Sequence, residues 1–403
     1  MPDPIFCALA FNSISWSSDG RASPCCGVRN WNPPSCTEDT PLIDRANMPS
    51  LVQVRKDLAA GIYPEVCTLC QEQDDHSLPS MRTIWNNAYK KTLRESKLEP
   101  IVSADDIVSM NINIGNKCNS KCMTCGFINS DLWLDEYLYI FNHPKVVAST
   151  PYHVINDDKK ADEIIDSFKN LQHITFMGGE PTISDNATYM LKRYVQEGRS
   201  KDIELTYTTN LTGITDELLD LWSNFKNIGL NVSIDGYGKT NEYIRYPFSW
   251  EKIDRNLDEC LYQVRNKKMG IGLGITASLF NSNHTHELFE YWYEKTKDIG
   301  TSCGVMINKV LEPDYMTIDL LPIKYRMQGV DKLLITKDKI PLSDARFRPM
   351  HSAIDTMISY LHEPQVVDRK RIDKIRNFIK MSDKYRKRDI RSYLPELYHE
   401  LYK

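Results

Sequence analysis

NIGNKCNSKCMTCGF, residues 113–127, follows an apolar β-rich run and carries three cysteines at C-x3-C-x2-C spacing. Thiolates of Cys118, Cys122 and Cys125 can hold three irons of a 4Fe-4S cluster and leave the fourth iron without a protein ligand. An open coordination position can take a substrate or a cofactor. The spacing alone is also compatible with a zinc site that lacks one ligand, or with buried free cysteines.

A second motif, ITFMGGEPTIS at residues 174–184, closes another β-rich run. Gly178 and Gly179 allow a ligand to approach the backbone closely, because neither residue has a side chain. Glu180, which precedes Pro181, can accept hydrogen bonds from an ammonium group. By itself, GGEP is also compatible with an ordinary turn.

Short β-rich runs alternate with helical patterns from about residue 107 onward, which indicates repeated β/α units around a parallel sheet. One helix is predicted after Ser249, with an apolar face made of Ile253, Leu257, Leu261 and Val264. Six strands are predicted, at Ile107–Ile114, His173–Met177, Ile203–Tyr207, Ile228–Ile234, Gly270–Ala277 and Gly304–Leu311.

The tricysteine loop after the first strand and GGEP after the second together resemble the radical S-adenosylmethionine (radical SAM) superfamily. The resemblance covers roughly residues 107–311. It implies an α/β fold, a partial, TIM-like (β/α)6 barrel with the active site at the carboxyl ends of its strands. It also implies that Cys118, Cys122 and Cys125 hold a catalytic 4Fe-4S cluster whose open iron binds S-adenosylmethionine.

The same resemblance gives roles to polar residues at the strand ends. Glu180 and the glycines beside it, in the motif Gly178–Pro181, would contact the methionine amine. The segment NVSIDGYGKTNEYIR, residues 231–245, is similar to the peptide-modifying and sulfatase-maturating branches. By that similarity Ser233 and Asp235 would face the ribose or the substrate, and Arg245 the methionine carboxylate. Asn210 ends the third strand, where the family often places polar contacts. Each of these residues is also compatible with a simple strand-end turn.

One position departs from the family. Many relatives have an aromatic residue immediately before the last cysteine, where its side chain covers the adenine, and this chain has Thr124. The nucleobase pocket is therefore expected to be wetter or to be lined from elsewhere.

A second group of cysteines lies near the N-terminus. Cys7, Gly20 and Cys25 form C-x12-G-x4-C, and the C-x2-C pair Cys67 and Cys70 follows. This pattern resembles the twitch domain, a shortened SPASM domain, which implies an auxiliary 4Fe-4S cluster on these four cysteines. In relatives the auxiliary domain more commonly follows the barrel. A four-cysteine zinc site remains the alternative, and Cys26 could replace Cys25.

These patterns divide the chain into three predicted domains: a cysteine-rich auxiliary domain at 1–100, the barrel at 101–322 and a helical extension at 323–403. The extension contains the basic stretch DRKRIDKIRNFIKMSDKYRKR, residues 368–388. Its simplest interpretation is a solvated helix whose inward face is made of Ile372, Ile375, Phe378 and Ile379. A nucleic-acid or partner surface is the alternative.

The composition of the 403 residues is that of a soluble globular protein, with 41% hydrophobic and 26% charged residues and a formal net charge of −4. Nothing in it requires nucleic acid as a partner. No apolar run approaches the ~20 residues of a membrane span, and the N-terminus lacks a basic signal region. Eleven cysteines, in tight groups and odd in number, favour metal binding over a disulfide framework. We expect a cytoplasmic protein without a membrane partner, in which Cys260 and Cys303 belong to the core.

The leading functional hypothesis is a radical SAM enzyme that modifies an unactivated C–H bond on a peptide or protein side chain. It would use S-adenosylmethionine, two 4Fe-4S clusters and an external one-electron reductant of flavodoxin or ferredoxin type. The first alternative is a small-molecule dehydrogenase or epimerase with a sugar or cyclitol substrate. The second is a non-catalytic metal-binding protein, against which GGEP and the 231–245 segment speak.

Overall fold

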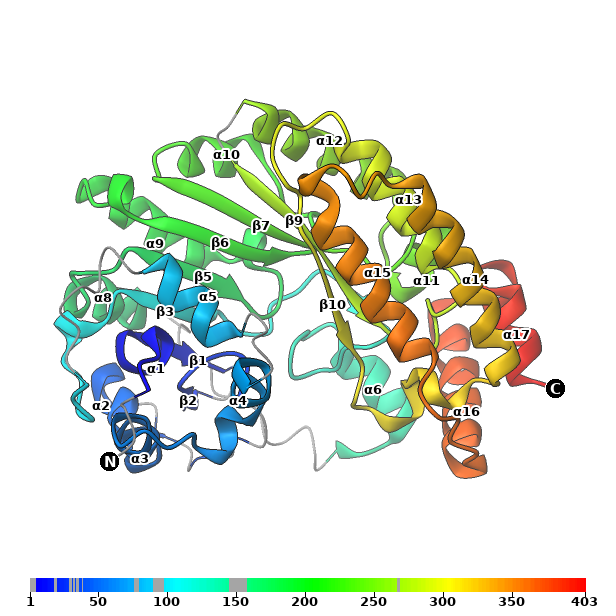
Figure 1. The fold of residues 1–403 in the computed structure, drawn as a ribbon, viewed down its shortest axis with the longest axis horizontal. Helices are drawn as coiled ribbons and strands as arrows, with labels where there is room; N and C mark the ends of the chain where they lie inside the picture. The colour runs from blue at the N-terminus through cyan, green and yellow to red at the C-terminus, as the bar shows by residue number, and fades with distance from the viewer. Residues whose placement is uncertain are drawn as a thin grey trace. The chain divides into compact units, whose positions relative to one another are not determined.

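A computed structural model describes residues 5–17, 20–28, 31, 33, 36–37, 39–75, 80–89, 98–144, 158–266 and 269–403. The chain folds into two compact units, each assembled from several segments (Figure 1). The first unit comprises Met1–Asn116, Pro151–Thr206 and Glu217–Asn227. The second comprises Lys117–Thr150, Tyr207–Asp216 and Ile228–Lys403.

Four strands of the first unit lie in the order β2-β1-β3-β5. β1 pairs in parallel with β3, from Ser13 opposite Ser109 to Trp16 opposite Ile112. β3 pairs in parallel with β5, and β2 is antiparallel to β1. Their bounds are β1 (Ser13–Trp16), β2 (Ala22–Ser23), β3 (Ser109–Asn113) and β5 (His173–Met177).

The sequence analysis did not predict β1 and β2. All four residues of β1 are buried, so the cysteine-rich N-terminal segment contributes a core strand as well as cysteines. The helices of this unit are α1 (Ala8–Asn12), α2 (Leu42–Ala46), α3 (Pro49–Ala59), α4 (Thr68–Asp75), α5 (Met81–Ala88), α8 (Asp158–Ser167) and α9 (Asp185–Gln196). β6 (Glu204–Thr209) and α10 (Asp216–Trp222) have residues in both units, as does β7 (Asn227–Ser233), whose first residue, Asn227, belongs to the first unit.

Buried arginines hold the N-terminal segment together. Arg55 of α3 is 2% exposed and donates to the carbonyl oxygens of Ala10 at 2.8 Å, Ala46 at 2.7 Å and Pro100 at 2.9 Å. Burial disfavours the charged guanidinium and lowers the pKa of Arg55 to about 10. Arg45, also buried, donates to carbonyl oxygens in the same way. These bonds tie together segments whose sequence has little apolar periodicity.

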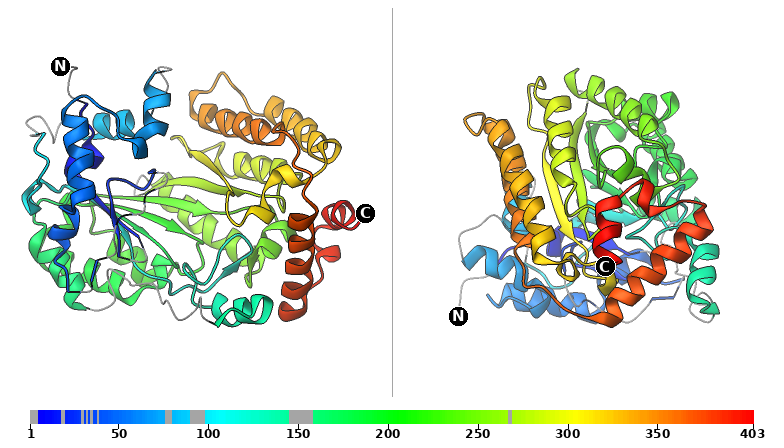
Figure 2. Two further views of the ribbon diagram at one scale, coloured as in Figure 1. Left: turned by 90° about the horizontal axis from the view of Figure 1, so that it is seen from below. Right: turned by 90° about the vertical axis from the view of Figure 1, so that its right-hand side faces the viewer.

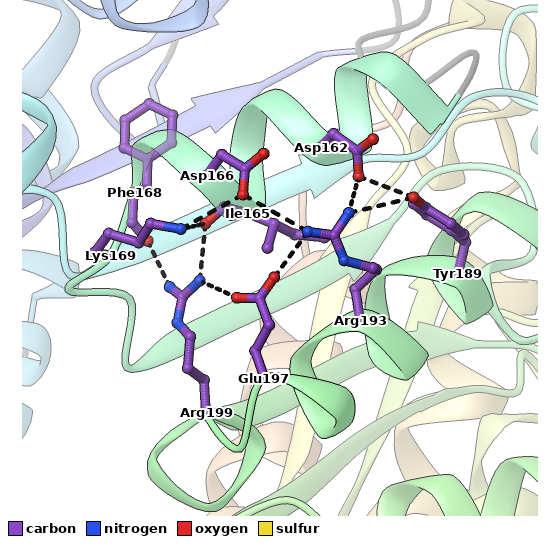
Figure 3. Close-up of polar contacts among 9 residues, drawn as sticks. All are labelled: Asp162, Ile165, Asp166, Phe168, Lys169, Tyr189, Arg193, Glu197 and Arg199. Atoms are coloured by element: carbon purple, nitrogen blue, oxygen red, sulfur yellow. Dashed lines mark hydrogen bonds and ion pairs between the residues drawn. The ribbon is translucent and has the colours of Figure 1, made fainter.

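Ion pairs join α8 to α9 (Figure 3). Arg193 of α9 forms an ion pair with Asp162 of α8, and its Nη2 lies 2.8 Å from an oxygen of Glu197. Arg199 donates to the carbonyl oxygens of Ile165 at 2.8 Å and Phe168 at 2.9 Å. The two helices are therefore fixed side by side by polar contacts as well as by their buried faces.

The second unit has the parallel strands β7 (Asn227–Ser233), β9 (Gly270–Ala277) and β10 (Val305–Lys309) in that order. β9 alternates half-buried glycine and threonine with buried apolar residues. α15 packs on β10, and α14 packs against both α13 and α15 (Figure 1). The helices are α6 (Trp133–Phe141), α11 (Lys239–Ile244), α12 (Trp250–Arg265), α13 (Thr285–Thr296), α14 (Ile323–Lys339), α15 (Arg348–Leu361), α16 (Arg369–Arg386) and α17 (Pro395–Leu401).

The structure confirms the predicted α/β class with mostly parallel strands. All six predicted strands are present, as β3, β5, β6, β7, β9 and β10. The helix predicted after Ser249 is α12, and its predicted apolar face is buried together with Cys260. Ser249 occupies the N-cap position, although its side chain makes no capping hydrogen bond to a described residue. Cys303 is buried as well.

The predicted helical C-terminal region is present and buries the expected residues. Ile375, Phe378 and Ile379 of α16 lie in a core cluster with Trp133, while Ile372 is half-buried. At the end of α16, Nε of Arg386 lies 2.8 Å from Oε1 of Glu136 on α6, with side-chain exposures of 2% and 0%. In the described residues, no helix is long and apolar enough to cross a membrane.

The buried ion pair between α6 and α16 leads to a stability prediction. Arg386→Met should lower the free energy of unfolding by about 3–5 kcal/mol, because it leaves the Glu136 carboxylate buried without its main cation. Urea unfolding of the two proteins measures the difference. Arg391→Met is the matched control, since Arg391 pairs with Asp389 at the surface and should change stability little. Equal losses in the two variants would contradict the prediction.

Candidate functional site

The loop that carries Cys118, Cys122 and Cys125 is held by main-chain pairing. β4 (Lys121–Cys122) is antiparallel to β8 (Arg245–Tyr246), with Cys122 opposite Arg245. The Met123 amide donates to the Ile244 carbonyl at 2.7 Å. The indole Nε1 of Trp133 donates to the Cys122 carbonyl at 3.0 Å. The middle cysteine is therefore positioned by β8, which is distant in sequence, and by the nearby helix α6.

Serine side chains complete the loop. The Ser130 hydroxyl donates to the Ser120 carbonyl at 2.7 Å, and the Ser120 hydroxyl donates to the Tyr246 carbonyl at 3.0 Å. The Ser120 hydroxyl also lies 3.2 Å from the Cys122 sulfur. The Cys125 amide donates to the Cys122 carbonyl at 3.0 Å. Because most of these bonds act on the backbone, the shape of the loop does not depend on its thiols.

The Cys125 thiol lies in an environment that disfavours the free thiolate. Burial, and then the neighbouring Cys122 thiol, raise the pKa of Cys125 to about 12, with a smaller contribution from Cys118. Nη1 of Arg245 donates to the Cys122 sulfur at 3.7 Å. Bound iron would remove the repulsion between thiolates, since metal ligation takes cysteine in its deprotonated form. The donor set therefore fits an iron-sulfur cluster.

Asp235, which is fully buried, and Arg245, which is half-buried, form an ion pair beside this loop. Nε of Arg245 lies 2.8 Å from Oδ2 of Asp235, which is fully buried. Burial opposes the charge on Arg245, but the Asp235 carboxylate, followed by Cys122, raises its pKa above the ordinary value. Among the described residues, neither of the two paired atoms has a partner with hydrogen-bond geometry. Incompletely bonded buried polar atoms of this kind are expected where a polar ligand completes the site.

The other oxygen of Asp235 connects the pair to β9. Oδ1 accepts from the Thr276 amide at 2.7 Å, and the Asn281 side chain donates to the carbonyls of Asp235 at 2.8 Å and Thr276 at 2.9 Å. The sequence analysis did not single out Asn281. Its place in the segment SLFNSN, directly after a predicted strand, was the available signal.

Asn210 contacts the cysteine loop directly. Its Nδ2 donates to Oδ1 of Asn119 at 3.0 Å, and Asn119 donates to the Thr212 hydroxyl at 2.8 Å. Asn119, between two of the cysteines, was also missed as a positioning residue. Ser233 ends β7 opposite Gly274 and is half-buried. The second unit thus brings together the three loop cysteines, Asn210, Asp235 and Arg245.

The GGEP motif lies in the first unit, directly after β5. Gly178 and Gly179 have positive φ angles of 81° and 49°, which favour glycine. A Cβ on Gly178 would meet Oδ1 of Asn113 at 1.8 Å. Glu180 is 1% exposed, and its carboxylate accepts from the Thr182 amide at 3.1 Å and from the Thr182 hydroxyl at 2.6 Å.

The four N-terminal cysteines line one cavity of the first unit. Cys7 precedes α1, Cys25 follows β2, Cys67 ends a short 3-10 helix and Cys70 lies on α4. Burial is the first cause of a raised pKa at Cys7 and Cys25, and it raises the pKa of Cys67 to about 12. Neighbouring cysteines contribute to all three shifts. Cys26 is exposed and is not among the described residues that line the cavity.

Residues of α5 hydrogen-bond to the backbone on both sides of Cys7. Asn86 accepts from the Ala8 amide at 2.8 Å and donates to the Phe6 carbonyl at 2.9 Å. Arg82 donates to the same carbonyl at 3.1 Å and pairs with Asp74 at 2.8 Å. The first cysteine is therefore positioned by the helix that follows the C-x2-C pair.

The arrangement of the cysteines in each group bears on whether they could bind a single metal ion or a multi-iron cluster. In the part of the chain that the structure describes, no three His, Cys, Asp or Glu side chains converge as ligands of a single metal ion. In a four-iron cluster each cysteine binds a different iron, so its ligands need not converge on one point.

An aromatic pocket borders the last loop cysteine. It has a volume of about 570 Å³, and Thr124 and Cys125 lie in its wall. Six aromatic rings contribute to the lining: Phe127, Trp133, Tyr137, Phe141, Tyr315 and Phe378. Glu312 adds one carboxylate at the lining. Such a pocket suits an apolar or planar group.

Comparison with known proteins gives one family. Residues 112–276 match the model of the radical SAM superfamily. Over 240 residues the chain is 29% identical to the radical SAM cyclopropyl synthase TigE of Paramaledivibacter caminithermalis. The match covers 59% of this chain and 47% of TigE, so the chain spans about half the length of that relative.

Two solved structures illustrate the more distant similarities. anSMEcpe with bound AdoMet is 17% identical with a TM-score of 0.38, over 58% of this chain and 61% of that one. SuiB of Streptococcus suis, bound to its precursor peptide SuiA, is 15% identical with a TM-score of 0.39, over 71% and 64%.

The close approach at Gly178 gives a prediction with an internal control. Gly178→Ala should displace Asn113, which accepts from the Gly115 amide at 3.1 Å. Gly198 also has a positive φ, of 70°, but no described atom lies within 4 Å of the position that a Cβ would occupy there. Gly198→Ala should therefore cost only the backbone strain of about 1–2 kcal/mol. In urea unfolding, Gly178→Ala should cost about 0.5–1.5 kcal/mol more, the value of the lost hydrogen bond. A smaller loss than in Gly198→Ala would refute the steric argument.

Proposed function

Since this chain belongs to the radical SAM superfamily, we propose that it cleaves S-adenosylmethionine reductively and modifies an unactivated C–H bond, on a peptide or protein side chain. The observation that carries the proposal is the geometry of the cysteine loop, in which Cys118, Cys122 and Cys125 are fixed through the backbone beside the Asp235–Arg245 pair. The family match spans this loop and the pair.

The cluster and the cofactor supply chemistry that no side chain has. Cys118, Cys122 and Cys125 would hold the 4Fe-4S cluster, which together with bound S-adenosylmethionine would supply one-electron reductive cleavage of the cofactor and removal of a hydrogen atom from the substrate. The protein's own residues hold and orient these groups. Arg245 would bind the methionine carboxylate, which would complete the hydrogen bonding of its buried guanidinium. We further propose, from the family resemblance, that residues Gly178–Pro181 contact the methionine amine.

The peptide substrate is supported by the similarity of residues 231–245 to the peptide-modifying branches of the family. The name of TigE describes the formation of a cyclopropyl group. A reaction of that type would belong to the proposed class of C–H modifications. A small-molecule dehydrogenase or epimerase is the second candidate. It is favoured by the electron acceptor that a fully ligated auxiliary cluster would provide.

We also propose an auxiliary 4Fe-4S cluster on Cys7, Cys25, Cys67 and Cys70. Its support is the common cavity that these four residues line, and the mutual influence of their thiols. Cys25 is favoured over Cys26 because, of these two, Cys25 lines the cavity. Four thiolates would leave this cluster without an open position.

The central test is replacement of Cys118, Cys122 and Cys125 by alanine in one variant. Anaerobically reconstituted wild-type protein should form 5′-deoxyadenosine from S-adenosylmethionine and dithionite, and the variant should form none, because no electron reaches the sulfonium. Mass spectrometry of the products measures both. Variant protein that still forms 5′-deoxyadenosine at the wild-type rate would disprove the assignment of the loop.

The auxiliary site makes a separate prediction about metal content. Cys67→Ala/Cys70→Ala should lower bound iron from about eight to about four per chain, because only the loop cluster remains. It should leave 5′-deoxyadenosine formation partly intact while product formation stops.

Cys26→Ala is the matched control and should keep the full iron content. Circular dichroism must first show that each variant is folded, since a metal-organised segment can unfold without its metal. Stoichiometric zinc in the wild-type protein, or loss of iron in Cys26→Ala, would contradict this ligand set.

A further inference from the structure

The outer face of α16 carries a row of lysines. Between Asp368 and Arg391 the sequence has eleven arginines and lysines against four aspartates, in a chain with a net charge of −4. Four lysines of α16 are exposed and point to the same side at helical spacing: Lys370, Lys374, Lys380 and Lys384. Within the described residues, none of these four ammonium groups forms an ion pair.

This arrangement has a cost for the helix. Lys370 and Lys374, and likewise Lys380 and Lys384, place like charges four residues apart, which destabilises a helix. On the opposite side of α16, Arg386 is instead buried in an ion pair with Glu136. The exposed lysines therefore contribute to a surface field without contributing to the packing of the unit.

The lysine row lies on a helix that contacts the cysteine loop. Nη1 of Arg386 lies 3.1 Å from the sulfur of Met123, the residue after Cys122, and the Ser382 hydroxyl donates to Glu136 at 2.7 Å. α16 lies beside α6, as Figure 2 shows. The indole Nε1 of Trp133 on α6 in turn donates to the Cys122 carbonyl. A protein docked on α16 would thus be separated from the loop by a single packed layer.

We infer that the outer face of α16 is the docking surface of the one-electron donor, a small acidic redox protein of flavodoxin or ferredoxin type. The inference rests on the function proposed above. In each encounter the donor loses one electron and the loop cluster gains it. A row of lysines steers an acidic partner and raises its association rate. The span from Lys370 to Lys384 is about 21 Å at 1.5 Å per residue, which suits the small interfaces of transient redox complexes.

A nucleic acid fits this face less well. Surfaces that bind single strands combine basic side chains with exposed aromatic rings on which bases stack. The aromatic residues of α16 are used for packing instead: Phe378 is buried, and Tyr385 packs against Tyr139 of α6. Charge without a stacking platform favours a carboxylate-rich protein partner.

The test compares two reductants and includes a direct binding measurement. The variant Lys374→Gln/Lys380→Gln/Lys384→Gln should bind reduced flavodoxin about tenfold more weakly in calorimetry, and flavodoxin-driven formation of 5′-deoxyadenosine should slow about tenfold at limiting flavodoxin. With dithionite, which needs no docking surface, the same variant should match the wild type. The control Lys201→Gln/Arg255→Gln/Arg265→Gln removes equal charge from exposed positions on other elements and should match the wild type with both reductants.

Wild-type protein gives a readout that does not depend on the folding of a variant. Flavodoxin binding should weaken steeply with salt, and carbodiimide crosslinks to flavodoxin should map to peptides of α16. Three results would overturn the inference: equal effects of the two triple variants, equal slowing with flavodoxin and dithionite, or RNA binding that is lost in the α16 variant while flavodoxin binding persists. If the wild type formed no 5′-deoxyadenosine even with dithionite, the proposed function would fail, and this inference with it.

Discussion

The ion pair between Asp235 and Arg245 anchors β8, the strand with which the cysteine loop pairs. A buried carboxylate and guanidinium each cost several kcal/mol in lost hydration unless they are paired. The Asp235 carboxylate is stabilised by its ion pair with Arg245 and by a hydrogen bond from the Thr276 amide. Arg245 also approaches the Cys122 sulfur. The pair therefore joins the segment after β7 and the strands β9 and β8 to the loop. A shift of any of these elements would leave a charged group without its partner.

The two groups of cysteines are supported by different means. The loop cysteines stand beside an extensive apolar core of the second unit, which includes Met123 and Trp133. The N-terminal cysteines lie next to a much smaller cluster, with Phe11, Val54 and Leu58. There Arg45 and Arg55 donate to main-chain carbonyls and replace apolar packing with hydrogen bonds. Ligation by a cluster would add cross-links of the kind that small, loop-rich segments need.

One basic stretch, α16, places its charged side chains in two different environments. Its sequence alone gives no means of telling an inward arginine from an outward lysine, because both carry a positive charge. In the folded unit Arg386 lies against Glu136, a carboxylate contributed by α6, while the lysines face solvent. The planar guanidinium can satisfy several acceptors in a buried site, whereas the flexible ammonium group is better suited to water and to transient contacts.

The sequence by itself determined the β/α alternation, the positions of six strands and the motifs that resemble the radical SAM superfamily, because periodicity and motif spacing are local properties of the chain. β1 was missed because a four-residue buried strand has too little periodicity to be recognised. Only the tertiary structure decided that Arg245 pairs with Asp235, that Asn119 meets Asn210, and that Cys25 rather than Cys26 lines the N-terminal cavity. These contacts depend on where distant segments pass each other, and no local pattern of residues contains that information.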